Sequence, residues 1–285
     1  MKVGIVGEIH PSGYEIFDKN NIEYFVTNNI DEDHLIEKLR DVDGIVVRTA
    51  EINKNILSQA KNLKIVARHG VGYDNVDTEY LNNNKIAMAI TGTANATSVA
   101  EHVMTMMLCL TKNIFESDKL VKLGKFKEKG NLPNYFELYN KKILILGFGR
   151  IGKALAKRCS GFEMEVYVHD PFLSDEEIKN HECISINKEE GFKIADYISV
   201  HLPLNEETKN LISFDQFETF KSNLILINTA RGGIINEDAL YEALKNKKIF
   251  GAGVDVFEKE PPCLLYTSPS PRDRTRSRMP SSAWK

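Results

Sequence analysis

A glycine-rich turn directly after a short apolar segment constrains the fold of this chain more than any other feature. Residues 142–146 read Lys-Ile-Leu-Ile-Leu, and the spacing G-x-G-x-x-G follows at once with Gly147, Gly149 and Gly152. The first glycine permits a tight turn, the second lets the backbone approach a pyrophosphate, and the third lets helix and strand pack closely. The pattern predicts a strand over 142–146, a helix over about 151–158 and a dinucleotide site at the turn.

An acidic residue after the next strand indicates which dinucleotide this site would hold. A strand is expected over 165–169, and it ends at Asp170. A carboxylate at that place can accept hydrogen bonds from both hydroxyls of an adenine ribose. Pro171 follows, and neither Arg nor Lys adjoins Asp170 to bind a 2′-phosphate. The sequence therefore favours NAD over NADP. The alternative is a glycine-rich turn in another kind of α/β protein with an acid at a strand end.

Composition limits the classes of partner. The chain has 285 residues, which suits two domains, and its net charge of −3 predicts neither a nucleic-acid nor a membrane partner. The apolar run 103–110 is too short to span a bilayer and is expected to be a buried helix. The cysteines show no C-x-x-C pair and no metal-ligand spacing, so we expect no metal site and a cytoplasmic location. These cysteines are Cys109, Cys159, Cys183 and Cys263.

Alternating strands and helices predict an α/β fold with two doubly wound parallel-sheet domains. Residues 1–97 are expected to form a flavodoxin-like substrate domain. Residues 98–262 are expected to form a Rossmann NAD-binding domain that lacks its C-terminal end. Strands of the first domain are expected to begin near Lys2, Gly44, Leu63 and Lys85.

The second domain is expected to begin with a long helix over 98–111 and a polar connecting arm over 115–140. Ser174 and Glu177 have the spacing of a capping box, and Asn236 is a suitable N-cap. A full dinucleotide-binding sheet usually has six strands, and one fewer is expected here. The expected strands are 142–146, 165–169, 196–200, 224–228 and 250–256.

The composition changes abruptly after Pro262. Residues 263–285 contain neither Ile nor Asn, and they are rich in Arg and Pro. The stretch 263–273, CLLYTSPSPRD, resembles translated adapter sequence at the end of an assembled fragment. We therefore expect the tail 263–285 to be non-native and the chain to be C-terminally truncated. The alternative is a native, disordered basic tail.

An arginine follows the strand expected over 224–228, in the stretch Asn-Thr-Ala-Arg-Gly-Gly that ends at Gly233. Ligands of α/β proteins bind at the carboxyl edge of the sheet. A guanidinium there can hold a carboxylate through two hydrogen bonds and polarise a neighbouring carbonyl. Arg231 is therefore a candidate for binding a substrate carboxylate, and an ordinary surface arginine is the alternative.

Several motifs, taken together in their order, carry a family resemblance. They are residues 68–77, 99–102, 147–152, 228–236 and 251–262. The set resembles the D-isomer-specific 2-hydroxy acid dehydrogenases, including the 3-phosphoglycerate dehydrogenase-like members. The resemblance implies an active site in a cleft between two doubly wound domains, with NAD as cofactor. It also implies hydride transfer between NAD(H) and a small 2-hydroxy or 2-keto acid, and a homodimer when the protein is full length.

The resemblance also assigns roles to individual residues. Arg231 matches the arginine that binds the substrate carboxylate, and Glu260 matches the acid that hydrogen-bonds the catalytic histidine. Asp255 matches the residue that holds the nicotinamide carboxamide. Val71 and Gly72 match backbone contacts near the substrate carboxylate and the nicotinamide. The cofactor contacts are completed by Gly147, Gly149, Arg150, Ile151, Gly152, Asp170, Leu202, Pro203, Thr229 and Ala230.

Two further points from the resemblance concern the substrate and the activity. Arg48 and Arg68 match positions that contact the substrate phosphate in 3-phosphoglycerate dehydrogenases, or they are general features of the wider family. The family's catalytic histidine lies after the Glu-Pro motif, and no histidine follows His201 here. We therefore expect the chain as written to be inactive. The alternative is a non-catalytic NAD-binding regulator of the corepressor type, although retention of Arg231 and Glu260 favours an enzyme.

Overall fold

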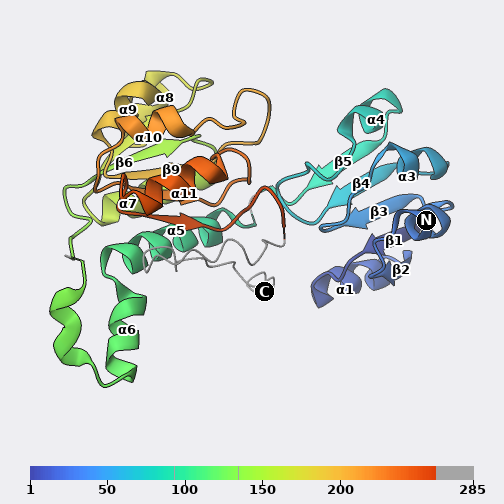
Figure 1. Ribbon diagram of the computed structural model, residues 1–285. Coiled ribbons are helices and arrows are strands. Elements are labelled where there is room, and N and C mark those ends of the chain that lie inside the picture. The colour runs from blue at the N-terminus through green and yellow to red at the C-terminus, as the bar shows by residue number, and fades with distance from the viewer. Residues whose placement is uncertain (93, 134, 261–285) are drawn as a thin grey trace. The chain divides into compact units, whose positions relative to one another are not determined.

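A computed structural model describes residues 1–92, 94–133 and 135–260 (Figure 1). The chain divides into two compact units, residues 1–95 and the residues from 96 onward. We call them unit 1 and unit 2, and each is described by itself. The tail 263–285, expected to be non-native, lies outside the described residues.

Unit 1 contains a parallel sheet with the strand order β2-β1-β3-β4-β5. This is the order of flavodoxin-like sheets, in which the winding direction reverses between the first and third strands. Its strands are β1 (Lys2–Val6), β2 (Glu23–Thr27), β3 (Gly44–Val47), β4 (Ile65–Arg68) and β5 (Ala87–Ile90). Its helices are α1 (Pro11–Lys19), α2 (Glu32–Leu39), α3 (Lys54–Gln59) and α4 (Thr78–Asn83).

Unit 2 contains a parallel sheet with the strand order β11-β10-β9-β6-β7-β8. This is the order of a Rossmann sheet, so the expected α/β class with two doubly wound parallel sheets is confirmed. Its strands are β6 (Lys142–Leu146), β7 (Glu165–His169), β8 (Ile184–Ser185), β9 (Tyr197–Val200), β10 (Ile225–Asn228) and β11 (Gly251–Val254). Its helices are α5 (Ala96–Thr111), α6 (Ile114–Lys122), α7 (Arg150–Gly161), α8 (Asp175–Lys179), α9 (Lys188–Ile194), α10 (Phe214–Thr219) and α11 (Glu237–Lys245), with a 3-10 turn η1 (Phe126–Asn131).

The expectation of five strands in the second sheet was wrong, because the structure has six. The missed strand is β8, which pairs with β7 through Tyr167 opposite Ile184 and Val168 opposite Ser185. A strand of two residues is too short to show the alternation by which strands are found in a sequence. The predicted shortage of one strand is therefore not found among the residues that the structure describes.

Helices cover both faces of the sheet of unit 2 (Figure 1). Successive side chains of a strand point to opposite faces. Ile143 and Ile145 accordingly pack in one buried cluster with α5 and α7, and Leu144 and Leu146 in another with α9, α10 and α11. This arrangement holds the carboxyl edge of the strands in place, and the candidate site lies along that edge.

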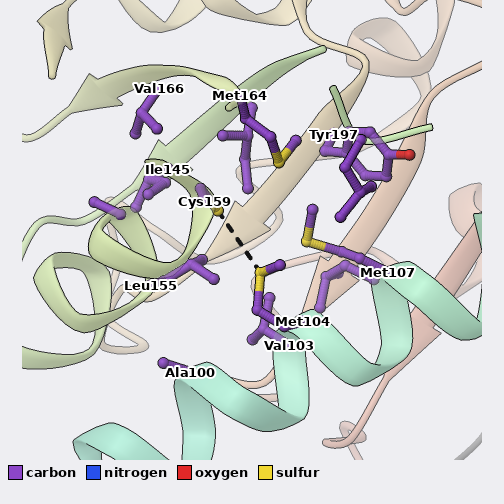
Figure 2. Packing of buried hydrophobic residues seen from close by; sticks show 14 of the residues in the cluster. Ala100, Val103, Met104, Met107, Ile145, Leu155, Cys159, Met164, Val166 and Tyr197 are labelled. Atoms are coloured by element: carbon purple, nitrogen blue, oxygen red, sulfur yellow. Dashed lines mark hydrogen bonds between the residues drawn. The ribbon is translucent and has the colours of Figure 1, made fainter. Parts of the chain in front are cut away.

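Sulfur-containing side chains fill the interface between α5 and α7 (Figure 2). The Cys159 thiol donates a weak hydrogen bond to Met104 Sδ at 3.8 Å, and burial raises the pKa of this thiol to about 12. Further along α5, the hydroxyl groups of Thr111 and Tyr197 lie 2.9 Å apart in the core. The methionines of this helix therefore serve packing, as expected for a buried helix.

The helix starts in unit 2 agree with their sequence signals. Ser174 and Glu177 form the capping box of α8, and Asn236 Oδ1 accepts from the Ala239 amide at the start of α11. The expected polar connecting arm differs in one respect, because it contains α6 and η1 and exposes apolar side chains such as Val121 and Phe126. Among the described residues, no helix is both long and apolar enough to cross a bilayer.

Candidate active site

The turn after β6 requires glycine at its first position. Gly147 has φ of +88°, and its amide donates to the His169 carbonyl oxygen at 3.0 Å. A Cβ at Gly147 would lie 2.7 Å from the His201 carbonyl oxygen, and a Cβ at Gly152 would overlap the Gly147 carbonyl oxygen. The turn, α7 and the end of β9 are therefore packed together as tightly as their backbones allow.

Gly149, the N-cap of α7, meets different surroundings. It is exposed, and a Cβ built on it finds no heavy atom of the described residues within 4 Å. The first backbone amides of α7, at Arg150 and Ile151, have no carbonyl partner within the helix, and they carry the positive end of its dipole. A helix start of this kind next to open space suits the pyrophosphate of a dinucleotide.

Asp170 directly follows β7, which is the strand next to β6 in the sheet. Its Oδ2 accepts from the Phe148 amide at 2.8 Å, and its Oδ1 accepts from the Phe172 amide at 3.0 Å. These bonds hold the carboxylate beside the glycine-rich turn, and each oxygen keeps a lone pair for another donor. The geometry fits a carboxylate that receives ribose hydroxyls.

The segment after β10 is organised by Asn228, a buried residue that the sequence analysis did not single out. Its Oδ1 accepts from the Ala230 amide at 3.0 Å, and its Nδ2 donates to the Arg231 carbonyl oxygen at 2.9 Å. Arg231 Nη1 in turn donates to the Ala230 carbonyl oxygen at 2.6 Å. Thr229 Oγ1 is shielded from solvent and finds no hydrogen-bond partner among the described residues.

The segment after β11 lies against the segment after β10. A Cβ at Gly232 would overlap the backbone of Phe257, so the two segments touch through their main chains. The Asp255 amide donates to the Asn228 carbonyl oxygen at 3.0 Å. Glu260 is exposed, and its Oε1 accepts from the Phe257 amide at 3.2 Å. The fold thus brings Arg231, Asp255 and Glu260 to neighbouring segments at one sheet edge.

Two histidines of unit 2 also belong to this region. His102 on α5 places Nε2 at 3.6 Å from Asp255 Oδ1, and the two side chains are 9% and 19% exposed. His201 follows β9, and its Nε2 lies 2.9 Å from Ser199 Oγ. Burial lowers the pKa of His201 to about 4, so this imidazole is neutral at physiological pH. Leu202 and Pro203, expected to flank the cofactor, follow His201 directly.

The residues present fit a dinucleotide at the edge of the unit 2 sheet. Gly149 leaves open space before α7, Asp170 offers carboxylate oxygens beside it, and Thr229 has a buried hydroxyl that needs a partner. A buried polar atom without a partner costs free energy unless a ligand or water satisfies it. Among the described residues, no group of three or more His, Cys, Asp or Glu side chains could hold a metal ion.

The candidate residues of unit 1 gather at the carboxyl ends of β3 and β4. Arg48 follows β3, while Arg68 ends β4 and donates from Nη1 to the His69 carbonyl oxygen at 2.9 Å. Burial lowers the pKa of His69, and the charges of Arg48 and Arg68 lower it further. Val71 and Gly72 follow in the half-buried loop after β4. The arginines thus share one end of the sheet.

Fold and site together define a protein with a Rossmann dinucleotide-binding unit. Residues 104–273 match the model of the NAD binding domain of D-isomer specific 2-hydroxyacid dehydrogenase. The match covers more than half of the chain, and the chain therefore belongs to the D-isomer-specific 2-hydroxyacid dehydrogenase family. Unit 2 accordingly contains an NAD-binding domain of this family, as the sequence predicted.

Proteins that are similar to this chain in sequence or in structure support the assignment to this family. D-3-phosphoglycerate dehydrogenase of Archaeoglobus fulgidus is 37% identical over 263 residues, which are 92% of this chain and 50% of that protein. Hydroxypyruvate reductase of Thermotoga maritima is 36% identical over 248 residues, 87% of this chain and 79% of that protein. D-lactate dehydrogenase of Aquifex aeolicus, solved with NAD and lactic acid, aligns with a TM-score of 0.80 and 27% identity over 91% of this chain and 78% of its own. This chain therefore spans about half the length of the phosphoglycerate dehydrogenases it matches.

Proposed function

We propose that this chain is part of an NAD-dependent oxidoreductase that transfers a hydride between NAD(H) and a small 2-hydroxy or 2-keto acid. One observation carries the proposal: Asn228 links the main chains of Arg231 and Asp255 at the edge where the cofactor would bind. An arginine beside a nicotinamide is suited to a substrate that carries a carboxylate next to its reacting carbonyl.

In this proposal each residue has a defined task. The amides of Arg150 and Ile151 bind the pyrophosphate, and Asp170 accepts the ribose hydroxyls. Asp255 accepts from the nicotinamide carboxamide and thereby sets which ring face meets the substrate. Bound NADH would supply the hydride. Arg231 binds the substrate carboxylate and polarises the neighbouring carbonyl, which stabilises negative charge as it develops on oxygen.

The substrate itself is proposed to be a 2-hydroxy acid with a phosphate, such as 3-phosphoglycerate. The support is the pair Arg48 and Arg68, whose charges both act on His69 at one end of the unit 1 sheet. Guanidinium groups are well suited to phosphate oxygens. The similarity to D-3-phosphoglycerate dehydrogenases agrees with this choice.

A homodimer in the cytoplasm completes the proposal. The arm formed by α6 and η1 exposes apolar side chains, among them Phe115, Val121 and Phe126. Exposed apolar side chains that gather on one projecting segment favour a protein partner, here a second copy. The described cysteines, Cys109, Cys159 and Cys183, are free thiols, as suits a reducing compartment.

The test is a titration of the chain with NADH followed by 2-keto acids, monitored by nicotinamide fluorescence. We expect NADH to bind, and pyruvate, hydroxypyruvate and 3-phosphohydroxypyruvate to change the fluorescence of bound NADH, the phosphorylated acid at the lowest concentration. Arg231→Gln should abolish the response to all three acids while NADH still binds.

Arg158→Gln is the matched control, because Arg158 lies at the other end of α7 and pairs with Glu101. It should respond as the wild type does. NADH binding with no keto-acid response in the wild type would instead favour a non-catalytic NAD-binding regulator.

A further inference from the structure

We propose that His102 is a positioning residue that holds the Asp255 carboxylate in the orientation needed to receive the nicotinamide carboxamide. The inference rests on the proposed function, in which Asp255 contacts the nicotinamide. His102 itself is not proposed to touch the substrate or the cofactor.

Both ends of the pair are anchored to the sheet of unit 2. His102 lies on α5, and its neighbours Val103 and Met106 are fully buried in the core. The main chain of Asp255 is fixed by the hydrogen bond from its amide to the Asn228 carbonyl oxygen at 3.0 Å. The main chains on both sides of the contact are therefore fixed, and the orientation of the Asp255 carboxylate depends on its side-chain contacts.

The distance and the burial make the interaction effective. Nε2 of His102 lies 3.6 Å from Oδ1 of Asp255, with the side chains 9% and 19% exposed. At this separation the contact is longer than a hydrogen bond, and it is an electrostatic attraction when Nε2 of His102 carries a proton. With so little water around the pair, the attraction is stronger than it would be at the surface. A proton on Nε2 that faces Oδ1 would hold the carboxylate in one orientation, in which Oδ2 is proposed to accept from a carboxamide N–H.

The neighbouring residue Glu101 offers a contrast on the same helix. Its carboxylate pairs with Arg158 Nη2 at 2.9 Å, but it is 63% exposed. Solvent-exposed ion pairs contribute little to the stability of the folded chain. Glu101→Gln therefore changes charge on α5 without reaching the candidate site, and it is the matched control.

The experiment compares NAD with ADP-ribose, which has the same adenine, riboses and pyrophosphate but no nicotinamide. Calorimetric titration of wild type, His102→Phe, His102→Gln and Glu101→Gln gives the dissociation constants. His102→Phe keeps a ring but loses the donor, so NAD affinity should fall about tenfold, the loss expected for one misplaced charge-assisted hydrogen bond. ADP-ribose affinity should not change.

The other variants test whether a hydrogen-bond donor at the position of Nε2 is what NAD affinity requires. His102→Gln places an amide N–H near the former Nε2 and should recover most of the NAD affinity, and Glu101→Gln should match the wild type. Should His102→Phe not fold, His102→Asn replaces it with the same expectation, because its shorter amide falls short of Oδ1. Equal losses for NAD and ADP-ribose would show a merely structural role and overturn the inference, as would unchanged NAD affinity. A wild type that binds neither ligand would instead overturn the proposed function.

Discussion

Asn228 shows how one residue can organise a site without being part of its chemistry. Its side chain holds the Ala230 amide and the Arg231 carbonyl oxygen, and its own carbonyl oxygen accepts from the Asp255 amide. The sequence identified Arg231 and Asp255 by their motifs. It did not identify Asn228, because the partners of a buried amide are set by the fold and not by the motif in which it stands.

His201 is a second residue whose environment the sequence could not reveal, and it leads to a prediction about pH. Burial lowers its pKa from 6.5 to about 4 in the folded chain. A depressed folded pKa means that protonation favours the unfolded chain, so the stabilisation is complete above the unfolded pKa and is lost as pH falls from 6.5 toward 4.

We predict that His201→Gln flattens this part of the stability profile. The free energy of unfolding of the wild type should fall more steeply with decreasing pH in that window, by about 1.4 kcal/mol per pH unit. Gln keeps a polar atom near Ser199 Oγ and does not titrate. Urea unfolding of both proteins at several pH values from about 7 down to about 4.5 measures the difference. Parallel profiles would show that His201 is not buried as a neutral ring.

At the scale of elements, the sequence predicted well where hydrophobic pattern and turn chemistry agree. The strand over 142–146 and the capping box at Ser174 are present as expected. The strands that the sequence analysis missed are edge strands. β2 has no buried residue, and β8 has two residues in all. Such strands form because they pair with a neighbouring strand, so their own sequences carry little of the hydrophobic pattern by which strands are predicted.

Alanine substitutions at Gly149 and Gly152 should affect different properties, NAD affinity in the first case and the stability of the chain in the second. Gly152→Ala places a Cβ against the Gly147 carbonyl oxygen, so α7 must shift, and the chain should lose about 1–3 kcal/mol of stability. Gly149→Ala meets open space and should keep the wild-type melting temperature while NAD affinity falls, because the Cβ lies where the pyrophosphate approaches. Thermal unfolding and calorimetric titration of both variants measure these effects. Loss of stability in Gly149→Ala, or none in Gly152→Ala, would contradict the account of the turn.

At the scale of the whole molecule, the family and both sheets could be predicted from the sequence, but the substrate could not. The motifs carry the cofactor site within one unit. The proposed phosphate recognition rests on Arg48 and Arg68, whose sequence context alone does not separate a ligand contact from a general feature of the family. The structure adds that both arginines are close enough to lower the pKa of His69.

The residue content of the chain leads to a prediction about turnover. No histidine follows His201 in the sequence. Loss of a general acid typically costs about 10² to 10⁴ in rate. We therefore predict little NADH oxidation by the 285-residue chain with pyruvate, hydroxypyruvate or 3-phosphohydroxypyruvate, even where these acids bind. Turnover in the usual enzymatic range, about 1 to 10³ per second, would show that another residue supplies the proton.

The central claim is that unit 2 binds NAD through the glycine-rich turn and Asp170, and calorimetric titration with NAD and NADP tests it most directly. The wild type should bind NAD at least about tenfold more tightly, because the Asp170 carboxylate would repel a 2′-phosphate. Asp170→Asn should narrow that gap, whereas Asp175→Asn, a control in the first turn of α8, should leave it unchanged. NADP binding as tightly as NAD to the wild type, or a gap that Asp170→Asn leaves intact, would contradict the account.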